Sequence, residues 1–543
     1  MPQQQKKSLV WSAGVIFTTT ALLLSTTVYS DGGVKRITSG SHNDSNGEIT
    51  RKVMDVVNKK TVTKPPNVPV RPIYKRGEVV KHTSKETGIW VTYQDGVYDI
   101  TEFVDVHPGG ERILLAAGQA IDPFWAMFSI HGTAETKELL ETYRIGDLIP
   151  REHDETAQEE KNHGLDLLFA NEPERDPSLR VLAPRPCNAE AALSSLDTFI
   201  TPNEKFYVRN HLPVPDIDLE TYRLTIEGPG IPEGFSLSLE ELKKDFPRFS
   251  VMATLQCAGN RRKEMHEVQP VKGLQWQSGA ISNAVWTGVR LRDVLEKAGY
   301  RVEDLSEPDF PHGIEHVVLD GAEGYGASIP IEKALSPRGD VVLAYEMNGE
   351  PIPADHGRPL RAVVPGHVAA RSVKWLSRIE LSDDESLSHW QQRDYKGFSP
   401  SADLASSDYS KSQSIQELPV QSSIIQPAPG EPLVVEDGFV TVKGYAISGG
   451  GKAINRVDVS KDGGKTWSDA QLTIPPQRRG RTWAWTKWEA KLPVGNETEF
   501  EIVCKAVDEA YNTQPDSFAG VYNVRGVLVS AWQRMKTKIV KDN

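Results

Sequence analysis

The sequence contains few cysteines and no excess of positive charge. Its 543 residues include three cysteines, Cys187, Cys257 and Cys504, which lie far apart, so neither a disulfide framework nor a CxxC or Cys/His zinc site is expected. The formal net charge is −12. Nucleic acid is therefore excluded as an expected partner, because phosphate binding needs a basic surface. A regular alternation of strands and helices is also missing, which argues against a Rossmann fold.

Two histidines suggest a haem site. His107 lies in the turn sequence His-Pro-Gly-Gly (residues 107–110), and His131 follows 24 residues later. Taken alone, a histidine in such a turn is more often a structural residue. The flanking segments 97–101 (VYDIT) and 143–148 (YRIGDL) change this interpretation, because together with the histidines they resemble a cytochrome b5 domain. The resemblance implies that both histidines are axial ligands of a haem b, which then carries electrons and does not bind oxygen.

Acidic residues are concentrated in the same region. Residues 75–150 contain 12 Asp or Glu and 7 Lys or Arg, a net charge of −5. This charge favours docking of a cationic redox protein, and a merely solvated acidic surface explains it equally well.

Cys257 has a distinctive chemical context. It stands in residues 255–262 (LQCAGNRR), among small residues and close to the guanidinium groups of Arg261 and Arg262. A thiolate ligates soft metals, and arginines hold oxyanions. Without further context, however, a cysteine in an apolar run is more often a small buried hydrophobic residue.

Five other segments supply that context. They are residues 206–211 (FYVRNH), 344–349 (AYEMNG), 355–357 (DHG), 365–366 (PG) and 393–398 (RDYKGF). With the Cys257 motif, and in this order, they resemble the molybdenum-cofactor domain of the sulfite oxidase family over about residues 182–395. The resemblance implies that Cys257 ligates molybdenum beside the dithiolene of molybdopterin.

The resemblance also implies the remaining site residues. The catalytic set that it gives is Cys257, Arg209, Arg262, Tyr395, Trp276 and Arg525. The residues implied for cofactor binding are Tyr207, Val208, Arg209, Asn210, His211, Cys257, Glu323, His356, Arg361, Ser372, Val373 and Lys374. Without the motifs, the arginines would be interpreted as ion-paired surface residues and the aromatic residues as core. Glu323 stands where the family commonly has an aspartate, and its extra methylene changes its reach.

The predicted fold class is α+β multidomain. Residues 291–298 are helix-like and residues 317–319 and 341–344 strand-like, which favours a mixed α+β central domain. Residues 440–445, 457–460 and 500–507 alternate in hydrophobicity around the turn sequence 462–464 (DGG), which indicates an antiparallel sandwich. The resemblance makes this sandwich immunoglobulin-like and dimerising. The predicted domains are a targeting segment (1–30), a flexible tether (31–73), a cytochrome b5-like haem domain (74–150), a flexible linker (151–164), a molybdopterin domain (165–400) and the sandwich (401–543).

The N-terminal segment indicates where in the cell the protein is expected to lie. Residues 8–29 carry no charge, follow Lys6 and Lys7, and are long enough to cross a bilayer as a helix. They are expected to be a sorting segment or a membrane anchor, and a secretory signal is the alternative. The resemblance implies the mitochondrial intermembrane space.

Taken together, these features predict a homodimeric sulfite oxidase with Mo-molybdopterin and haem b. Sulfite would be oxidised to sulfate, and the electrons would pass singly through the haem to cytochrome c. One alternative is a nitrate reductase-like molybdoenzyme, although that class places haem after molybdenum and adds a flavin domain for which no room is expected here. The other is a non-enzymatic cytochrome b5-type carrier fused to a degenerate domain, which the intact Cys257 motif argues against.

Overall fold

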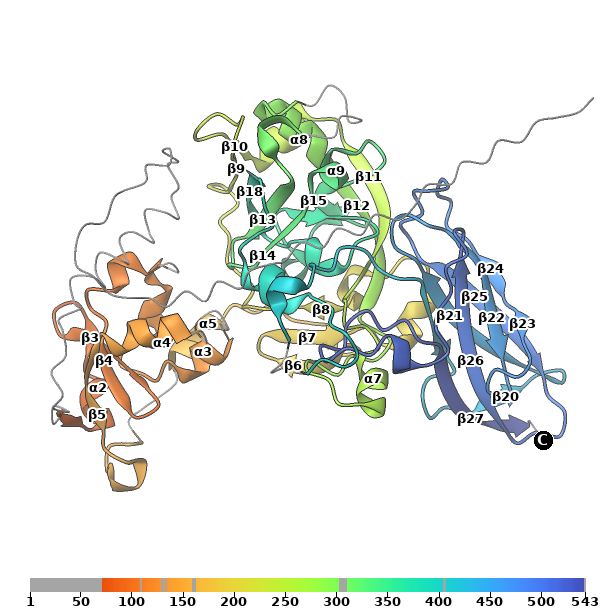
Figure 1. Cartoon of the computed structure of the whole chain (residues 1–543), viewed down its shortest axis with the longest axis horizontal. Helices are drawn as coiled ribbons and strands as arrows, with labels where there is room; N and C mark the ends of the chain where they lie inside the picture. Colours follow the sequence, from red (N-terminus) through yellow and green to blue (C-terminus); the bar gives the residue numbers. More distant parts are fainter. Residues whose placement is uncertain are drawn as a thin grey trace, which may run out of the picture.

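The computed structural model describes residues 71–107, 110–127, 131, 134–158, 163–301, 310–403 and 407–541. The predicted targeting segment, and all but the last three residues of the predicted tether, lie outside these ranges. Within them, no helix combines the length and hydropathy that crossing a membrane requires. Figure 1 shows a small mixed part in orange, a central part in yellow to teal and a sheet-rich part in blue.

The first part is a small sheet with short helices around it. Its strands are β1 (Ile73–Tyr74), β2 (Thr83–Ser84), β3 (Gly88–Tyr93), β4 (Gly96–Asp99) and β5 (Arg144–Leu148), in the order β1-β5-β4-β3-β2. The helical segments are α2 (Arg76–Val79), η1 (Val104–Val106), η2 (Gly110–Ala116), α3 (Asp122–Met127) and α4 (Ala134–Glu141). Alternate residues of β3, Ile89 and Val91, are buried in its core with Tyr98 of β4.

The polar segment after this part begins as an ordered turn, η4 (Arg151–His153). Asp154 is buried, and it accepts hydrogen bonds from the backbone nitrogen (2.9 Å) and Nη1 (3.2 Å) of Arg76. Thr156 Oγ1 accepts a further bond from Gly77 N at 2.8 Å. The first half of the predicted linker 151–164 is therefore tied to the small domain, and its last residues form the start of α5 (His163–Leu168).

The described residues of the central part form three sheets. One has the order β6-β7-β8, one β10-β9-β18-β13-β14 and one β11-β12-β15-β16, with β17 paired to β15. Their bounds are β6 (Arg180–Pro184), β7 (Cys187–Glu190), β8 (Val208–Arg209), β9 (Arg223–Glu227), β10 (Ser236–Ser238), β11 (Phe249–Gln256), β12 (Ile281–Arg290), β13 (His316–Gly321), β14 (Gly326–Pro330), β15 (Val342–Met347), β16 (Glu350–Pro351), β17 (Arg361–Val363) and β18 (Leu376–Ser382). The predicted strand 317–319 falls within β13. The predicted strand 341–344 falls within β15 except for residue 341, which precedes it.

Helices of the central part are short. They are η5 (Leu193–Asp197), η6 (Asn203–Lys205), α6 (Leu239–Asp245), α7 (Arg262–Val268), α8 (Leu291–Ala298), η7 (Pro311–Gly313), α9 (Ile331–Leu335), η8 (Ala354–His356), η9 (Ala369–Arg371), the π-helical turn η10 (Trp390–Asp394) and η11 (Tyr409–Lys411). Helix α8 coincides with the predicted helix. It buries Leu291, Val294, Leu295 and Ala298 on one face and ends at Gly299, whose φ of 112° is a conformation that favours glycine.

The C-terminal part is a two-sheet sandwich, as the alternating pattern predicted. One sheet has the order β19-β21-β25-β24 and the other β20-β27-β26-β22-β23. The elements are β19 (Gln421–Gln426), β20 (Leu433–Val435), β21 (Phe439–Ile447), β22 (Ile454–Ser460), β23 (Ser468–Asp469), β24 (Gln471–Thr473), β25 (Thr486–Pro493), β26 (Glu499–Asp508), η12 (Phe518–Gly520) and β27 (Gln533–Lys541). The predicted multidomain α+β fold class is confirmed.

Candidate active site

Cys257 lies directly after the last residue of β11. Strands β11 and β12 pair in register from Phe249 to Gln256, and the cysteine nitrogen continues the contact by donating to Ala280 O at 3.0 Å. The chain then turns, with Asn260 N donating to Cys257 O at 2.9 Å, and enters α7. Because an antiparallel strand pair fixes the backbone before Cys257 and helix α7 follows a few residues after it, the backbone position of Cys257 is well defined.

Cys257 lines a cavity of about 60 Å³. Of the predicted residues, Tyr207, Arg209, His211, Glu323, His356, Arg361, Ser372, Val373, Lys374 and Tyr395 line it as well. Val208 and Asn210 do not: Val208 packs in a separate buried cluster with Leu179, Cys187 and Ala189, and the buried Asn210 amide bonds to Asp355 and to Lys374 Nζ. Most of the predicted set, drawn from positions far apart in the sequence, thus surrounds one space.

Buried cations gather at the end of the cavity near His356. The Arg361 guanidinium donates from Nη1 to His356 O and from Nη2 to Ser372 O, both at 2.9 Å. Burial lowers the pKa of Arg361 to about 10 and the pKa of Lys374 to about 7, because charge is poorly solvated there. A bound anion would offset this cost, so the donor set fits a phosphate group.

Asp355 organises these groups, and the sequence interpretation did not assign it a role. Its carboxylate accepts from Arg175 Nε and Nη2 at 2.8 and 2.9 Å and from Asn210 Nδ2 at 2.9 Å. Lys374 Nζ donates to the Asp355 carbonyl at 2.8 Å and also to Asn210 Oδ1. The only sequence signal for Asp355 is the matching segment 355–357, from which the resemblance implies a role for the histidine alone.

Tyr395 and His211 meet at the cavity lining. The Tyr395 hydroxyl lies 2.9 Å from His211 Nε2, and the His211 ring packs on Tyr325 with ring centroids 4.6 Å apart. Burial raises the pKa of Tyr395 and lowers the pKa of His211 well below its ordinary value. At neutral pH the phenol therefore keeps its proton and the imidazole is neutral, so the pair can offer a hydrogen-bond donor to an anion.

Arg262, Trp276 and Arg525 do not line the cavity. Arg262 donates from Nε to the carbonyls of Arg525 (3.1 Å) and Gly526 (3.0 Å) and from Nη1 to Leu274 O (3.0 Å). A Cβ on Gly526 would lie 2.7 Å from Arg262 Cγ, so glycine is needed there. Trp276 is fully buried in one core cluster with Cys257 and Tyr207. These side chains stand behind or beside the cavity wall.

The two predicted haem histidines face each other. The His107 and His131 ring centroids are 6.2 Å apart and the ring planes differ by 5°. That separation leaves room for one metal atom between two ring nitrogens at about 2 Å each. Phe103 and Trp125 pack on His107 and His131, with centroids at 5.7 and 5.5 Å. The residues present therefore fit a haem iron with two imidazole ligands.

Comparison with known proteins assigns families to the three parts. Residues 75–149 match the cytochrome b5-like heme/steroid binding domain, residues 211–390 the oxidoreductase molybdopterin binding domain and residues 412–540 the Mo-co oxidoreductase dimerisation domain. Among solved structures, the sulfane dehydrogenase SoxCD from Paracoccus pantotrophus is similar, with a TM-score of 0.56 and 27% identity, over 68% of this chain and 88% of that chain.

Curated relatives extend the similarity over most of the chain. Sulfite oxidase of Gallus gallus is 52% identical over 474 residues, which are 86% of this chain and 100% of that protein. Mitochondrial sulfite oxidase of Homo sapiens is 51% identical over 472 residues, 85% of this chain and 84% of that protein. Nitrate reductase (NADH) 1 of Oryza sativa subsp. japonica is 38% identical over 388 residues, which are 68% of this chain and 42% of that protein.

Proposed function

The chain belongs to the sulfite oxidase family, and from this premise we propose how its own residues serve the reaction. The protein is an oxidoreductase that uses molybdopterin and haem to oxidise sulfite to sulfate. When bound, the molybdenum cofactor supplies the oxygen transfer and two-electron uptake that side chains lack, and the haem accepts the electrons singly. The residues of the chain bind, orient and shield these groups.

Cys257 is the metal ligand in this proposal. Cys257 lines the cavity, and the antiparallel pair of β11 and β12 fixes its backbone. Arg361 and Lys374 would hold the phosphate of the pterin, since both are buried cations whose charge an anion would stabilise. Glu323 lines the same cavity, so the longer side chain still reaches it. Tyr207, His211, His356, Ser372 and Val373 complete the binding surface.

Arg209 and Tyr395 are the proposed sulfite-binding pair. Arg209 lines the cavity, and its Nη1 donates to Asn188 Oδ1 at 3.0 Å and Asn210 O at 2.8 Å, so its direction is set from behind. The protonated Tyr395 hydroxyl, supported by His211, adds a neutral donor. Arg262 and Arg525 contribute positive charge from outside the cavity lining. Trp276 acts through packing against the region of Cys257.

Electrons would leave through the haem held by His107 and His131 to cytochrome c. The acidic balance of residues 75–150 supports a cationic acceptor. The protein is mitochondrial and assembles as a homodimer through its C-terminal domain, in keeping with the relatives' names and the family of residues 412–540. We place it in the intermembrane space, where residues 1–30 would direct it or tether it. We also propose that the haem domain spans residues 74–150, the molybdopterin domain residues 165–400 and the dimerising sandwich residues 401–543.

The observation that carries the proposal is one cavity that combines Cys257, Arg209 and Tyr395 with the buried cations Arg361 and Lys374. The test is anaerobic addition of sulfite to the oxidised, molybdenum-loaded protein while the haem Soret and α bands are recorded. Rapid haem reduction is expected. If the spectrum stays unchanged, the substrate assignment is wrong, and nitrate consumption by the reduced protein is then measured.

A further inference from the structure

The C-terminal domain holds the loop that follows Cys257. Ala258 O accepts from Leu528 N at 2.7 Å, and Asn260 Nδ2 donates to the Tyr445 hydroxyl at 2.8 Å. Arg261 reaches strand β19, and Arg262 reaches the carbonyls after η12. Within a stretch of five residues, 258 to 262, four contact the sandwich, so the loop is shared between two domains.

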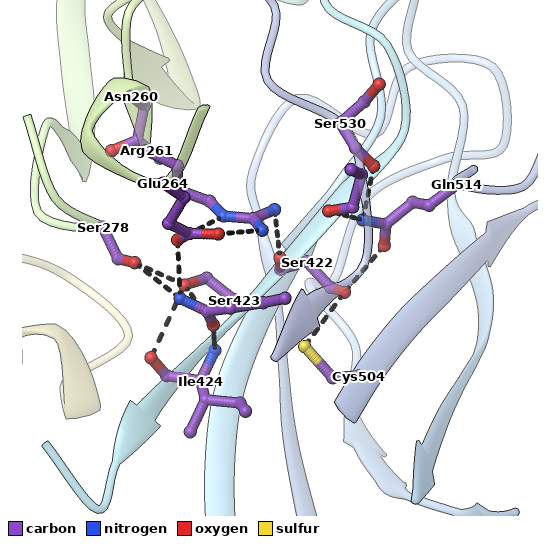
Figure 2. A network of polar contacts seen from close by, with 12 residues as sticks. Asn260, Arg261, Glu264, Ser278, Ser422, Ser423, Ile424, Cys504, Gln514 and Ser530 are labelled. Carbon is purple, nitrogen blue, oxygen red and sulfur yellow. Dashed lines mark hydrogen bonds and ion pairs between the residues drawn. The ribbon is translucent and has the colours of Figure 1, made fainter. Parts of the chain in front are cut away.

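Arg261 is the centre of these contacts (Figure 2). It is fully buried and adopts a φ of 65°, a left-handed conformation that is unfavourable for arginine. Its Nε and Nη2 donate to the two carboxylate oxygens of Glu264 at 2.9 and 2.6 Å, and Nη1 donates to Ser422 O at 3.1 Å. One planar guanidinium therefore joins the start of α7 to the neighbouring domain.

Further hydrogen bonds, from Gln533 of the sandwich, hold the Glu264 carboxylate. Gln533 Nε2 donates to Glu264 Oε1 at 2.9 Å and to Ser278 Oγ at 3.1 Å. Its Oε1 accepts from Ser423 Oγ at 2.9 Å and from Ile424 N. Figure 2 shows Glu264, Ser278 and Ser423 gathered beside Arg261. Each of these polar groups has a partner, so a loss of one group leaves others unsatisfied.

We propose that Arg261 is a positioning residue for the molybdenum site, through which the C-terminal domain fixes the direction of the Cys257 loop. This rests on the proposed function, because it takes Cys257 as the metal ligand. The left-handed backbone at Arg261 lets its side chain point into the sandwich while the chain continues at Arg262 into α7 beside the cavity. The domain that makes the dimer thus also completes the metal site within each subunit.

The consequence is a link between cofactor retention and the domain interface. If the Arg261 contacts are lost, the loop loses its left-handed turn and the thiol of Cys257 loses its fixed direction. Removal of groups that orient metal ligands typically weakens metal binding by about 10- to 100-fold. The haem domain should not respond, because the Arg261 side chain bonds to Glu264 of the central part and Ser422 of the sandwich.

The experiment compares the full-length protein with Arg261→Gln and Arg261→Lys. We expect Arg261→Gln to lower the molybdenum content per haem by about 10-fold after dialysis against a chelator. The fraction that keeps metal should show an altered electron paramagnetic resonance signal of pentavalent molybdenum. Arg261→Lys should be intermediate, since one ammonium group cannot bridge Glu264 and Ser422 as a planar fork does.

Two further variants separate positioning from general stability. Arg481→Gln removes a different contact between the domains, the ion pair with Asp340, and should leave metal content and signal unchanged. The double variant Arg261→Gln, Glu264→Gln avoids a half-buried carboxylate that has lost its ion-pair partner, and serves if the single variant fails to fold. The inference is overturned if Arg261→Gln retains parental metal content and signal, or if Arg481→Gln alters them equally. A parent protein that takes up no molybdenum or does not oxidise sulfite would instead refute the proposed function.

Discussion

Arg525 of the C-terminal domain forms an ion pair with Asp394, the residue directly before Tyr395. Burial, with the neighbouring charges of Arg262 and Arg209, lowers the pKa of Arg525 to about 10. Asp394 thus holds the Arg525 guanidinium close to the Tyr395–His211 pair, in addition to Arg209 of the cavity lining. The pair ties the π-helical turn that ends at Asp394 to the sandwich domain.

Replacement of Arg525 by Gln should weaken sulfite binding. Loss of a partly buried positive charge beside the cavity weakens the electrostatic attraction for an anion, so the KM for sulfite should rise by about 10-fold, which corresponds to about 1.4 kcal/mol, with a smaller change in kcat. Steady-state kinetics over a range of sulfite concentrations measures this. Arg534→Gln, in an exposed position of the same domain, is the matched control. An unchanged KM would place Arg525 outside the binding of substrate.

Cys257→Ser should abolish turnover and leave the haem spectrum intact. A hydroxyl is a poor replacement for a thiolate metal ligand, so kcat should fall by at least about 100-fold. Activity and the Soret band are measured on the same sample. Cys504→Ser, at another buried cysteine, should keep most of its activity because its thiol contacts Ser422 in the sandwich. Parental turnover in Cys257→Ser would refute the metal assignment.

His131→Ala should remove the haem and separate the two half-reactions. The His107 and His131 rings would no longer enclose an iron, so reduction of cytochrome c should fall to background. Sulfite oxidation with ferricyanide, taken to accept electrons at the central domain, should persist. The exposed His153→Ala is the control. If His131→Ala retains a six-coordinate haem spectrum, another ligand serves the iron.

His367 should make the protein sensitive to acid. Burial, with the charges of Lys333 and Arg371, lowers the pKa of His367 to about 3. The unfolded chain takes up a proton below about pH 6.5 and the folded chain does not, so stability is lost as the pH falls. Between pH 7 and pH 5 this amounts to about 2 kcal/mol.

The comparison of denaturant unfolding at pH 7 and pH 5 tests this effect. His367→Gln should show a smaller loss of stability than the parent, because it has no proton to gain. His153→Gln, at an exposed position, should behave as the parent does. Equal pH dependence in the parent and His367→Gln would show that other groups cause the acid sensitivity.

Shortening the linker should slow electron transfer from molybdenum to haem. Because Asp154 and Thr156 are bonded to the small domain, the informative deletion is residues 159–162. Flash photolysis or stopped-flow reduction of the haem should show a lower rate at unchanged sulfite KM. Substitution of the same residues by Gly and Ser at constant length is the control. Unchanged transfer after deletion would indicate that the two domains dock rigidly.

Local pattern made much of the architecture predictable. The amphipathic spacing from Leu291 to Ala298 and the alternation in residues 440–445 depend on neighbours in sequence, and both elements formed as expected. The motif around Cys257 and the histidine pair are also local signals. Asp355 was missed because its importance comes from Arg175, 180 residues away, and no spacing rule connects them.

By itself the sequence determined the chemical inventory: a cysteine beside two arginines, two histidines in a haem-type context, and three successive domains. Only the tertiary structure decided which of these groups face one cavity and which support it from behind. Arg262 and Trp276 carry the right chemistry, yet packing places them outside the cavity lining. The physical reason is that side-chain direction and burial depend on long-range packing between sheets and domains, whereas motif and periodicity depend only on the local chain.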